Sequence, residues 1–175
     1  MQESGRPFIV CAIVVTALAG SIVTAQSARP PSGATTKKFI GTWRLAVFES
    51  TAEETRRYRG ARPTGLLIYD ASGRMSVQIM PDRTRRTFTG PLSTVSGSAA
   101  PTPNEAFDAI MGYTAYFGTY TVDERAGTIT HHREGNINPG ALGAFVRRYI
   151  FVSDDRVTLV PVENDSSTLT WERVN

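Results

Sequence analysis

The sequence predicts a mostly β protein, an antiparallel up-and-down barrel of about eight strands with one short helix in a long loop. Two observations support this fold. Most of the chain after residue 38 consists of short apolar or alternating runs separated by turn residues, which is the pattern of a barrel or a sandwich. The connections between the runs alternate between tight turns and loops that, with one exception, are long. If the strands run alternately up and down, all the tight turns lie at one end and the long loops at the other, as in a ligand-binding barrel.

The expected strands are short and regularly spaced, and about eight of them suit a small barrel that holds one ligand. Asp70 to Gly73 predicts a tight hairpin between the second and third strands. A sandwich of two sheets is the alternative fold, but it gives no reason for tight and long connections to alternate. The strands are expected at residues 43–50, 66–69, 75–80, 116–122, 128–134, 145–152, 157–162 and 169–174.

The helix is expected at residues 103–111, within the long insertion between the third and fourth strands. Thr102 is placed to cap it, Pro103 suits the first helical position, and Glu105 completes a capping box. Gly112 is a plausible stop. Because the insertion lies at the loop-rich end, this helix is a candidate cover for the mouth of the barrel.

The first 25 residues have the layout of a secretory signal peptide. Arg6 precedes an apolar run over residues 8–20, and small residues at Val23 and Ala25 predict cleavage before Gln26. The apolar run is short for a membrane span, although an uncleaved anchor is the alternative. We therefore expect a signal peptide at 1–25, a flexible linker at 26–37 and a barrel domain at 38–175. We also expect a periplasmic or secreted protein with no stable membrane anchor after cleavage.

Composition limits the chemistry that the mature chain can perform. The single cysteine, Cys11, lies in the predicted signal peptide, which excludes disulfides and cysteine metal sites from the barrel. The net charge of +3 is small, and the basic residues are not interleaved with aromatic ones as they are in many nucleic-acid-binding proteins. The sequence therefore does not predict a nucleic-acid partner. No phosphate loop, dinucleotide fingerprint or Ser-His-Asp order is present. His131 and His132 are neighbours on one expected strand, so they point to opposite faces and cannot share a metal. The sequence thus predicts no cofactor and no metal.

Alternating residues on the expected strands supply candidate ligand-binding side chains. His132 and Glu134 share a face of one strand, and a plausible register places His132 beside Arg147, with Tyr149 on the same face. A slip of one residue would bring Arg148 beside His132 instead, and the residues leave open which face is interior. The full set of candidate ligand-binding residues is Gln78, Tyr116, Tyr120, His132, Glu134, Arg147 and Tyr149.

Arginines cluster in the two long connections that are expected at the open end. Arg57 and Arg59 lie in the first, and Arg83 and Arg85 lie in the second. A basic rim there would attract an anionic group and orient a carboxylate or phosphate. A solvated basic surface is the alternative interpretation.

An ordered set of motifs over residues 38–174 resembles the bacterial and fungal lipocalin-like domain family. The set comprises Gly41-Thr42-Trp43, the segments 75–80 and 115–120, Thr130-His131-His132 and Trp171-Glu172-Arg173. The resemblance implies a calycin-type barrel with an internal cavity and a structural pair in which Arg173 packs across Trp43. Barrels of this kind serve as carriers and as cofactor-free cyclases and isomerases.

These observations lead to two hypotheses of function. The first is an exported binding protein that holds a small hydrophobic or amphipathic molecule with an anionic head. The second is a cofactor-independent cyclase or isomerase that acts on a polyketide-like or terpenoid-like substrate in the same cavity. Without a nucleophile motif, catalysis would be acid–base, with His132, Tyr116, Glu134 and Arg147 as candidates.

Overall fold

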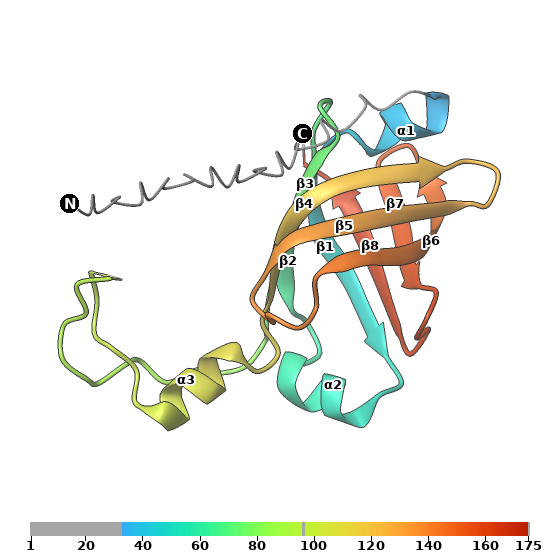
Figure 1. The fold of residues 1–175 in the computed structure, drawn as a ribbon. Coiled ribbons are helices and arrows are strands. Elements are labelled where there is room, and N and C mark those ends of the chain that lie inside the picture. The colour runs from blue at the N-terminus through green and yellow to red at the C-terminus, as the bar shows by residue number, and fades with distance from the viewer. Residues whose placement is uncertain (1–32, 96, 175) are drawn as a thin grey trace, which may run out of the picture.

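Eight antiparallel strands close into a barrel in the computed structural model, which describes residues 33–95 and 97–174 (Figure 1). Each strand pairs with the next in the chain, and β8 pairs with β1 to complete the closure. The predicted eight-stranded up-and-down barrel is confirmed. The strands are β1 (Gly41–Ser50), β2 (Thr64–Tyr69), β3 (Arg74–Met80), β4 (Thr114–Asp123), β5 (Thr128–Asn136), β6 (Gly143–Ser153), β7 (Arg156–Pro161) and β8 (Ser167–Arg173).

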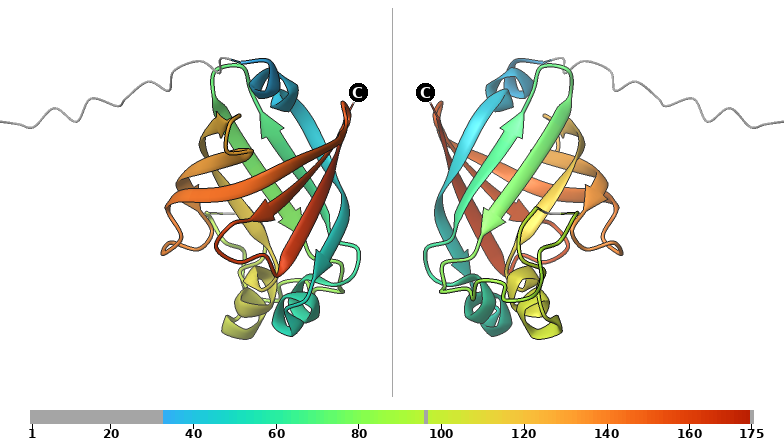
Figure 2. Two further views of the ribbon diagram at one scale, coloured as in Figure 1. Left: turned by 90° about the vertical axis from the view of Figure 1, so that its right-hand side faces the viewer. Right: turned by 90° about the vertical axis from the view of Figure 1, so that its left-hand side faces the viewer.

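The two ends of the barrel differ in the connections that they carry. Helices α2 (Glu53–Arg59) and α3 (Pro103–Ile110) lie at one end, and α1 (Ala34–Phe39) lies at the other (Figure 2). Short turns join β2 to β3, β4 to β5 and β6 to β7. In an up-and-down barrel these three turns fall at the same end, so a closed end and a loop-rich end are both present.

Helix α1 closes the tight-turn end of the barrel. Phe39 is fully buried, and its ring centroid lies 5.5 Å from that of Tyr69, 5.1 Å from that of Tyr149 and 4.9 Å from that of Phe151. Residues 34–37, which we expected in a flexible linker, belong to this helix. No side chain caps its N-terminus, so the sequence carries no start signal of the usual kind.

Trp43 and Arg173 pack together beside this helix, as the family resemblance implies. The Trp43 side chain is fully buried, and the Arg173 guanidinium lies 4.3 Å from the centroid of its ring. The indole Nε1 donates to the carbonyl of Phe39 at 2.7 Å, and Arg173 donates to the carbonyl of Ile40 at 2.8 Å. The pair therefore fastens α1 to the first and last strands.

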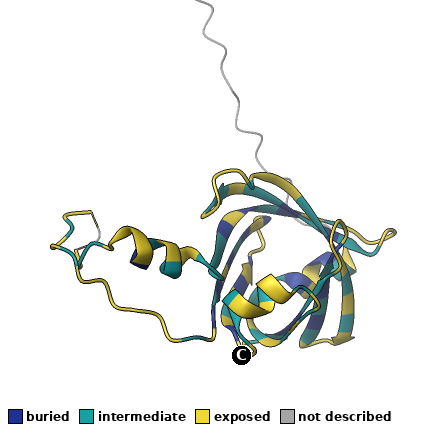
Figure 3. Cartoon of the chain, turned by 90° about the horizontal axis from the view of Figure 1, so that it is seen from below, coloured by how far each residue is buried: buried dark blue, intermediate teal, exposed yellow. Residues whose placement is uncertain are grey.

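At the loop-rich end, the sequence predicted that the helix of the long insertion covers the mouth, and the two helices found there are arranged differently. Helix α3 forms with the predicted capping box between Thr102 and Glu105, but it lies beside the barrel (Figure 3). Helix α2, which was not predicted, lies over the opening (Figure 3). The hypothesis that the helix of the long insertion covers the mouth is therefore wrong.

The predicted signal peptide at 1–25 lies outside the described residues, as does the first part of the linker. Within the part of the chain that the structure describes, no helix is both long and apolar enough to cross a membrane.

Candidate functional site: a basic cavity in the barrel

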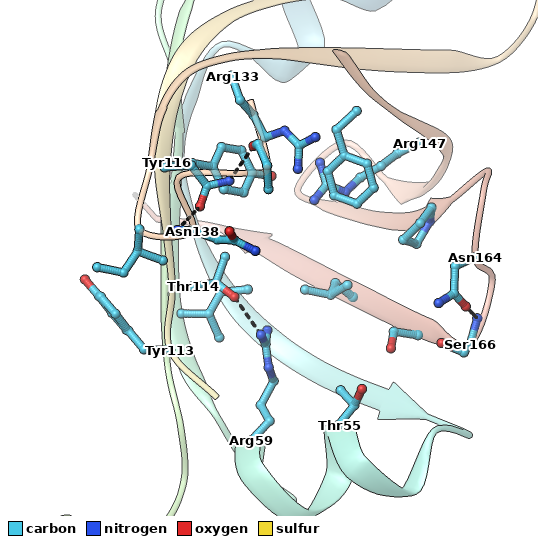
Figure 4. Close-up of a pocket in the computed structure, with 18 of the residues that line it drawn as sticks. Thr55, Arg59, Tyr113, Thr114, Tyr116, Arg133, Asn138, Arg147, Asn164 and Ser166 are labelled. Carbon is cyan, nitrogen blue, oxygen red and sulfur yellow. Dashed lines mark hydrogen bonds between the residues drawn. The ribbon is translucent and has the colours of Figure 1, made fainter. Parts of the chain in front are cut away.

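A cavity of about 500 Å³ occupies the loop-rich half of the barrel (Figure 4). Its apolar wall includes Phe48, Ile79, Phe145 and Leu169. Helix α2 contributes Thr55 and Arg59 at the mouth. Large buried side chains, among them Phe39, Trp43 and Tyr69, pack the tight-turn half, so this cavity lies on the mouth side.

Three arginines from different elements line this cavity. Arg147 on β6 is only 8% exposed, and its guanidinium stacks 4.0 Å from the ring centroid of Phe145. Arg133 on β5 is half-buried and lies 4.8 Å from the same ring. Arg59 at the end of α2 donates to the hydroxyl of Thr114 at 2.6 Å. Burial lowers the pKa of Arg59 from its ordinary value.

None of these arginines has an ion-pair partner among the described residues. The ion pairs of residues 33–95 and 97–174 use other cations. The cavity lining includes a single carboxylate, that of the exposed Glu163. Buried charges are usually paired, because removing an ion from water is costly. The cavity therefore has a local excess of positive charge.

His131 connects Arg147 to two tyrosines at the floor of the cavity. Its ring is 1% exposed. The Nη1 of Arg147 lies 2.6 Å from Nδ1 of His131, the Tyr116 hydroxyl lies 2.9 Å from the same Nδ1, and the Tyr69 hydroxyl lies 2.6 Å from Nε2. Because a guanidinium only donates, Nδ1 accepts and the proton resides on Nε2. Tyr116 then also donates to Nδ1, and His131 donates to Tyr69.

The environment of His131 keeps its ring neutral. Burial lowers the pKa of His131 well below its usual range, and the positive charges of Arg147 and Arg133 lower it further. Burial likewise raises the pKa of Tyr69 well above its usual range. The polar floor of the cavity is therefore a set of neutral groups around one fixed cation.

Sequence comparison identifies the family of the chain. Residues 40–174 match the model of the lipocalin-like domain. The chain belongs to this family. No curated protein matches the chain.

Several solved structures are similar to this lipocalin-like protein at low sequence identity. A redesigned β barrel is 10% identical, with a TM-score of 0.41, and the match covers 79% of this chain and 94% of that one. Fatty-acid-binding protein 1 of Echinococcus granulosus is 13% identical, with a TM-score of 0.38 and coverage of 79% and 99%. The wild-type fluorescent protein UnaG is 14% identical, with a TM-score of 0.35 and coverage of 79% and 98%.

Four of the seven residues predicted to bind ligand are interior in this lipocalin-like protein. Tyr116 and Arg147 line the cavity. Tyr120 and Tyr149 also face inward, but they lie toward the closed end, where Tyr120 donates to the carbonyl of Asp70 at 3.0 Å and Tyr149 packs against Phe39. Burial raises the pKa of Tyr120 to about 12. These two tyrosines fill the core and do not border the cavity.

The other three predicted ligand-binding residues face outward, and their expected interior position is wrong. His132 lies 3.0 Å from the hydroxyl of Thr121 on the outer surface, Glu134 forms an ion pair with Arg74, and Gln78 is exposed. His132 pairs with Ala144, three residues from the expected Arg147. Because an odd shift in register exchanges the two faces of a strand, His131 is interior and His132 is exterior.

The predicted basic rim is largely rearranged. Arg59 enters the cavity, whereas Arg57 and Arg85 are exposed. Arg83 has a structural role, because it donates to the carbonyl of Tyr58 and forms an ion pair with Asp108 of α3 at 2.5 Å. Only one of the four predicted rim arginines therefore faces the cavity.

Three side chains that border the cavity or a smaller void next to it were not predicted to bind ligand: His131, Arg133 and Trp171. The first two share the strand face opposite to His132, so the alternation itself could have found them with the correct register. Within the described residues, no three His, Cys, Asp or Glu side chains gather as metal ligands would. The absence of a metal and of a cofactor stays a prediction.

Proposed function

We propose that this lipocalin-like protein binds a small amphipathic molecule whose anionic group reaches the arginines inside the barrel. The observation that carries this proposal is the placement of Arg147, Arg133 and Arg59 around one cavity without a carboxylate partner in the described chain. The anionic group is thus bound by arginines inside the barrel and not by a basic rim at its mouth.

The physical basis is the cost of leaving cations without an ion-pair partner in a partly buried cavity. An anion in the cavity would offset that cost and would form charge-assisted hydrogen bonds with the guanidinium groups. The aromatic and aliphatic wall, with Phe48, Ile79 and Leu169, supports an apolar body for the ligand, as in most small-molecule sites.

The test compares decanoate with decan-1-ol, which has the same chain length but no charge. We expect decanoate to bind more tightly to the wild type. Arg147→Met should weaken decanoate binding about tenfold or more, since a hydrogen bond to a charged group contributes about 1.5–3 kcal/mol. It should change decan-1-ol binding little. Isothermal titration calorimetry measures both affinities.

Arg148→Met is the matched control, because Arg148 is the next residue on β6 and is exposed. It removes the same charge from the outer surface, so decanoate affinity should stay near that of the wild type. Equal affinities for decanoate and decan-1-ol that neither substitution changes would refute anion recognition by the cavity.

Export is proposed on the sequence of the first 25 residues alone. The charged start, the apolar run over 8–20 and the small residues at Val23 and Ala25 support cleavage before Gln26 and a periplasmic or secreted location. Intact-mass measurement of material from the native host tests this proposal. A full-length, membrane-bound product would contradict it.

A second candidate function, a cofactor-independent isomerase or cyclase, is favoured by one observation. The Tyr116 hydroxyl borders the cavity and lies 2.9 Å from Nδ1 of the neutral His131, beside Arg147. A tyrosine and a neutral imidazole can exchange a proton, and a guanidinium can stabilise a developing oxyanion. Recovery of a chemically altered molecule after incubation with a polyketide-like or terpenoid-like substrate would support this function, and a stable stoichiometric complex would favour the binding protein.

A further inference from the structure

A second, smaller void lies deeper in the barrel than the main cavity. It measures about 20 Å³ and is bordered by Trp171, His131 and Leu67. Tyr116 and Arg147 line both spaces, so the two adjoin at the polar floor. A space of this size accepts about one water-sized group.

Trp171 provides an unused hydrogen-bond donor beside this void. The residue is 2% exposed, and its Nε1 has no hydrogen-bond partner in the described part of the chain. The other tryptophan, Trp43, donates its Nε1 to the carbonyl of Phe39. Buried donors are nearly always paired, because an unpaired one loses the full free energy of its hydration. An acceptor from outside the chain would remove that cost.

The groups around the void select the chemistry of that acceptor. The indole N–H and the guanidinium of Arg147 only donate, and Nδ1 of His131 already receives bonds from Arg147 and Tyr116. A group that only accepts, and that carries negative charge, therefore suits this place better than a hydroxyl or an amine.

We infer that Trp171 and Arg147 form a deep subsite for one oxygen of a ligand carboxylate, so that the ligand enters the barrel with its head first. This inference rests on the proposed function and deepens it. The apolar body of the ligand then occupies the main cavity, against Phe48 and Leu169, and its tail points toward α2.

The competing arrangement places the carboxylate at the mouth. Arg59 lies there, and its Nε also has no partner in the described chain. A carboxylate on Arg59 would leave the indole of Trp171 unpaired and would direct the tail toward the polar floor. The two arrangements thus differ in which donor the ligand engages.

The indole N–H signals of the wild-type protein distinguish the two arrangements. The chain has two tryptophans, so an ¹H–¹⁵N spectrum contains two such signals. On addition of decanoate we expect the Trp171 signal to move downfield, because its proton forms a new hydrogen bond. The Trp43 signal should stay nearly unchanged. Decan-1-ol should move the Trp171 signal less.

A variant pair provides the second measurement. Trp171→Phe keeps an aromatic ring but removes the N–H, and it should weaken decanoate binding about tenfold while changing decan-1-ol binding little. Arg59→Met should weaken decanoate binding less than Trp171→Phe does. Thermal unfolding of each variant checks that it is folded, and the wild-type spectrum decides the question if Trp171→Phe is not.

The outcomes separate this inference from the proposed function. If decanoate binds through Arg147 or Arg59 but leaves the Trp171 signal unmoved, the head-first subsite is wrong and anion binding in the cavity stands. If decanoate does not bind to the wild type at all, both proposals are wrong.

Discussion

At the scale of single residues, the site depends on which of two adjacent histidines faces inward. His131 is buried between Arg147 and two tyrosines, whereas His132 contacts Thr121 on the outer surface. The inward ring serves as a neutral acceptor that holds the Arg147 guanidinium at the cavity floor. A protonated His131 could not accept that bond, so acid pH should disturb this arrangement.

The neutral state of His131 predicts a dependence of stability on pH. The folded protein keeps His131 neutral, because burial and Arg147 lower its pKa, while the unfolded chain binds a proton below about pH 6.5. Unfolding therefore takes up a proton in that range. The free energy of unfolding should fall with decreasing pH below about 6.5, by up to about 1.4 kcal/mol per pH unit, and should not depend on this group above it.

Urea denaturation between pH 7.5 and pH 5 measures this effect. His131→Gln should remove most of the decline between about pH 6.5 and pH 5, where ordinary carboxylates have not yet titrated. His132→Gln is the matched control, since His132 is the only other histidine, and it should retain the decline. A wild-type stability that is flat over this range would show that His131 is not held neutral.

The sequence located this site to within one residue but on the wrong face. Alternation correctly grouped Arg147 with the inward side of its strand, but the predicted register paired it with His132 and not with the face of His131. The choice depended on where the hairpin between β5 and β6 turns. Because β5 extends to Asn136 and β6 begins at Gly143, the true turn is tighter than expected, and Asn138-Pro139-Gly140 is a local turn signal that could have located it.

At the scale of elements, Arg83 fastens the long insertion to α2. Its guanidinium donates to the carbonyls of Tyr58 and Met111 and pairs with Asp108 of α3. The side chain is mostly buried among these partners, so it is unavailable to a ligand. Arg83 therefore attaches the insertion near the mouth, together with the ring contact between Tyr58 and Phe107 and the bond from the Asp82 N–H to the carbonyl of Arg59.

Removing this attachment should loosen the insertion without weakening ligand binding. Arg83→Gln loses the ion pair and several charge-assisted bonds, so we expect residues 84–110 to be cut by chymotrypsin, whose sites there include Phe88 and Leu92, several times faster than in the wild type. Arg85→Gln, which alters an exposed arginine nearby, should leave that rate nearly unchanged. Decanoate affinity should be the same in both variants. A large loss of decanoate affinity in Arg83→Gln would show that Arg83 contributes to ligand binding after all.

Elements with a strong local signal were predicted, and those fixed by packing were not. All eight strands and α3 carry alternation, turn residues or a capping box. Helix α1 exists because Phe39 inserts among Tyr69, Tyr149 and Phe151, and those contacts come from residues far away in the chain. Helix α2 is the exception: it buries none of its residues, and its local signals, Glu53 and Glu54 in the first turn and Gly60 after the last, were overlooked.

At the scale of the whole molecule, the barrel is divided into a packed half and a binding half. Trp43, Phe39, Tyr69 and Val157 fill the closed end, and burial of this large apolar area supplies most of the stabilisation. The mouth half gives up part of that packing for a cavity of about 500 Å³ that contains unpaired arginines. Stability and ligand affinity are therefore expected to compete at Arg147.

This competition predicts that Arg147→Met stabilises the empty protein while it weakens ligand binding. The substitution replaces a buried cation that has no carboxylate partner with an apolar side chain that fits against Phe145. We expect the free energy of unfolding without ligand to equal or exceed that of the wild type, by about 0.5–2 kcal/mol at most. Saturating decanoate should raise the Tm of the wild type through its preference for the folded state, and it should raise the Tm of the variant much less. Thermal unfolding of both proteins, with and without decanoate, measures these effects together. A variant that is several kcal/mol less stable than the wild type would mean that Arg147 supports the fold, and its bond to His131 would then be structural.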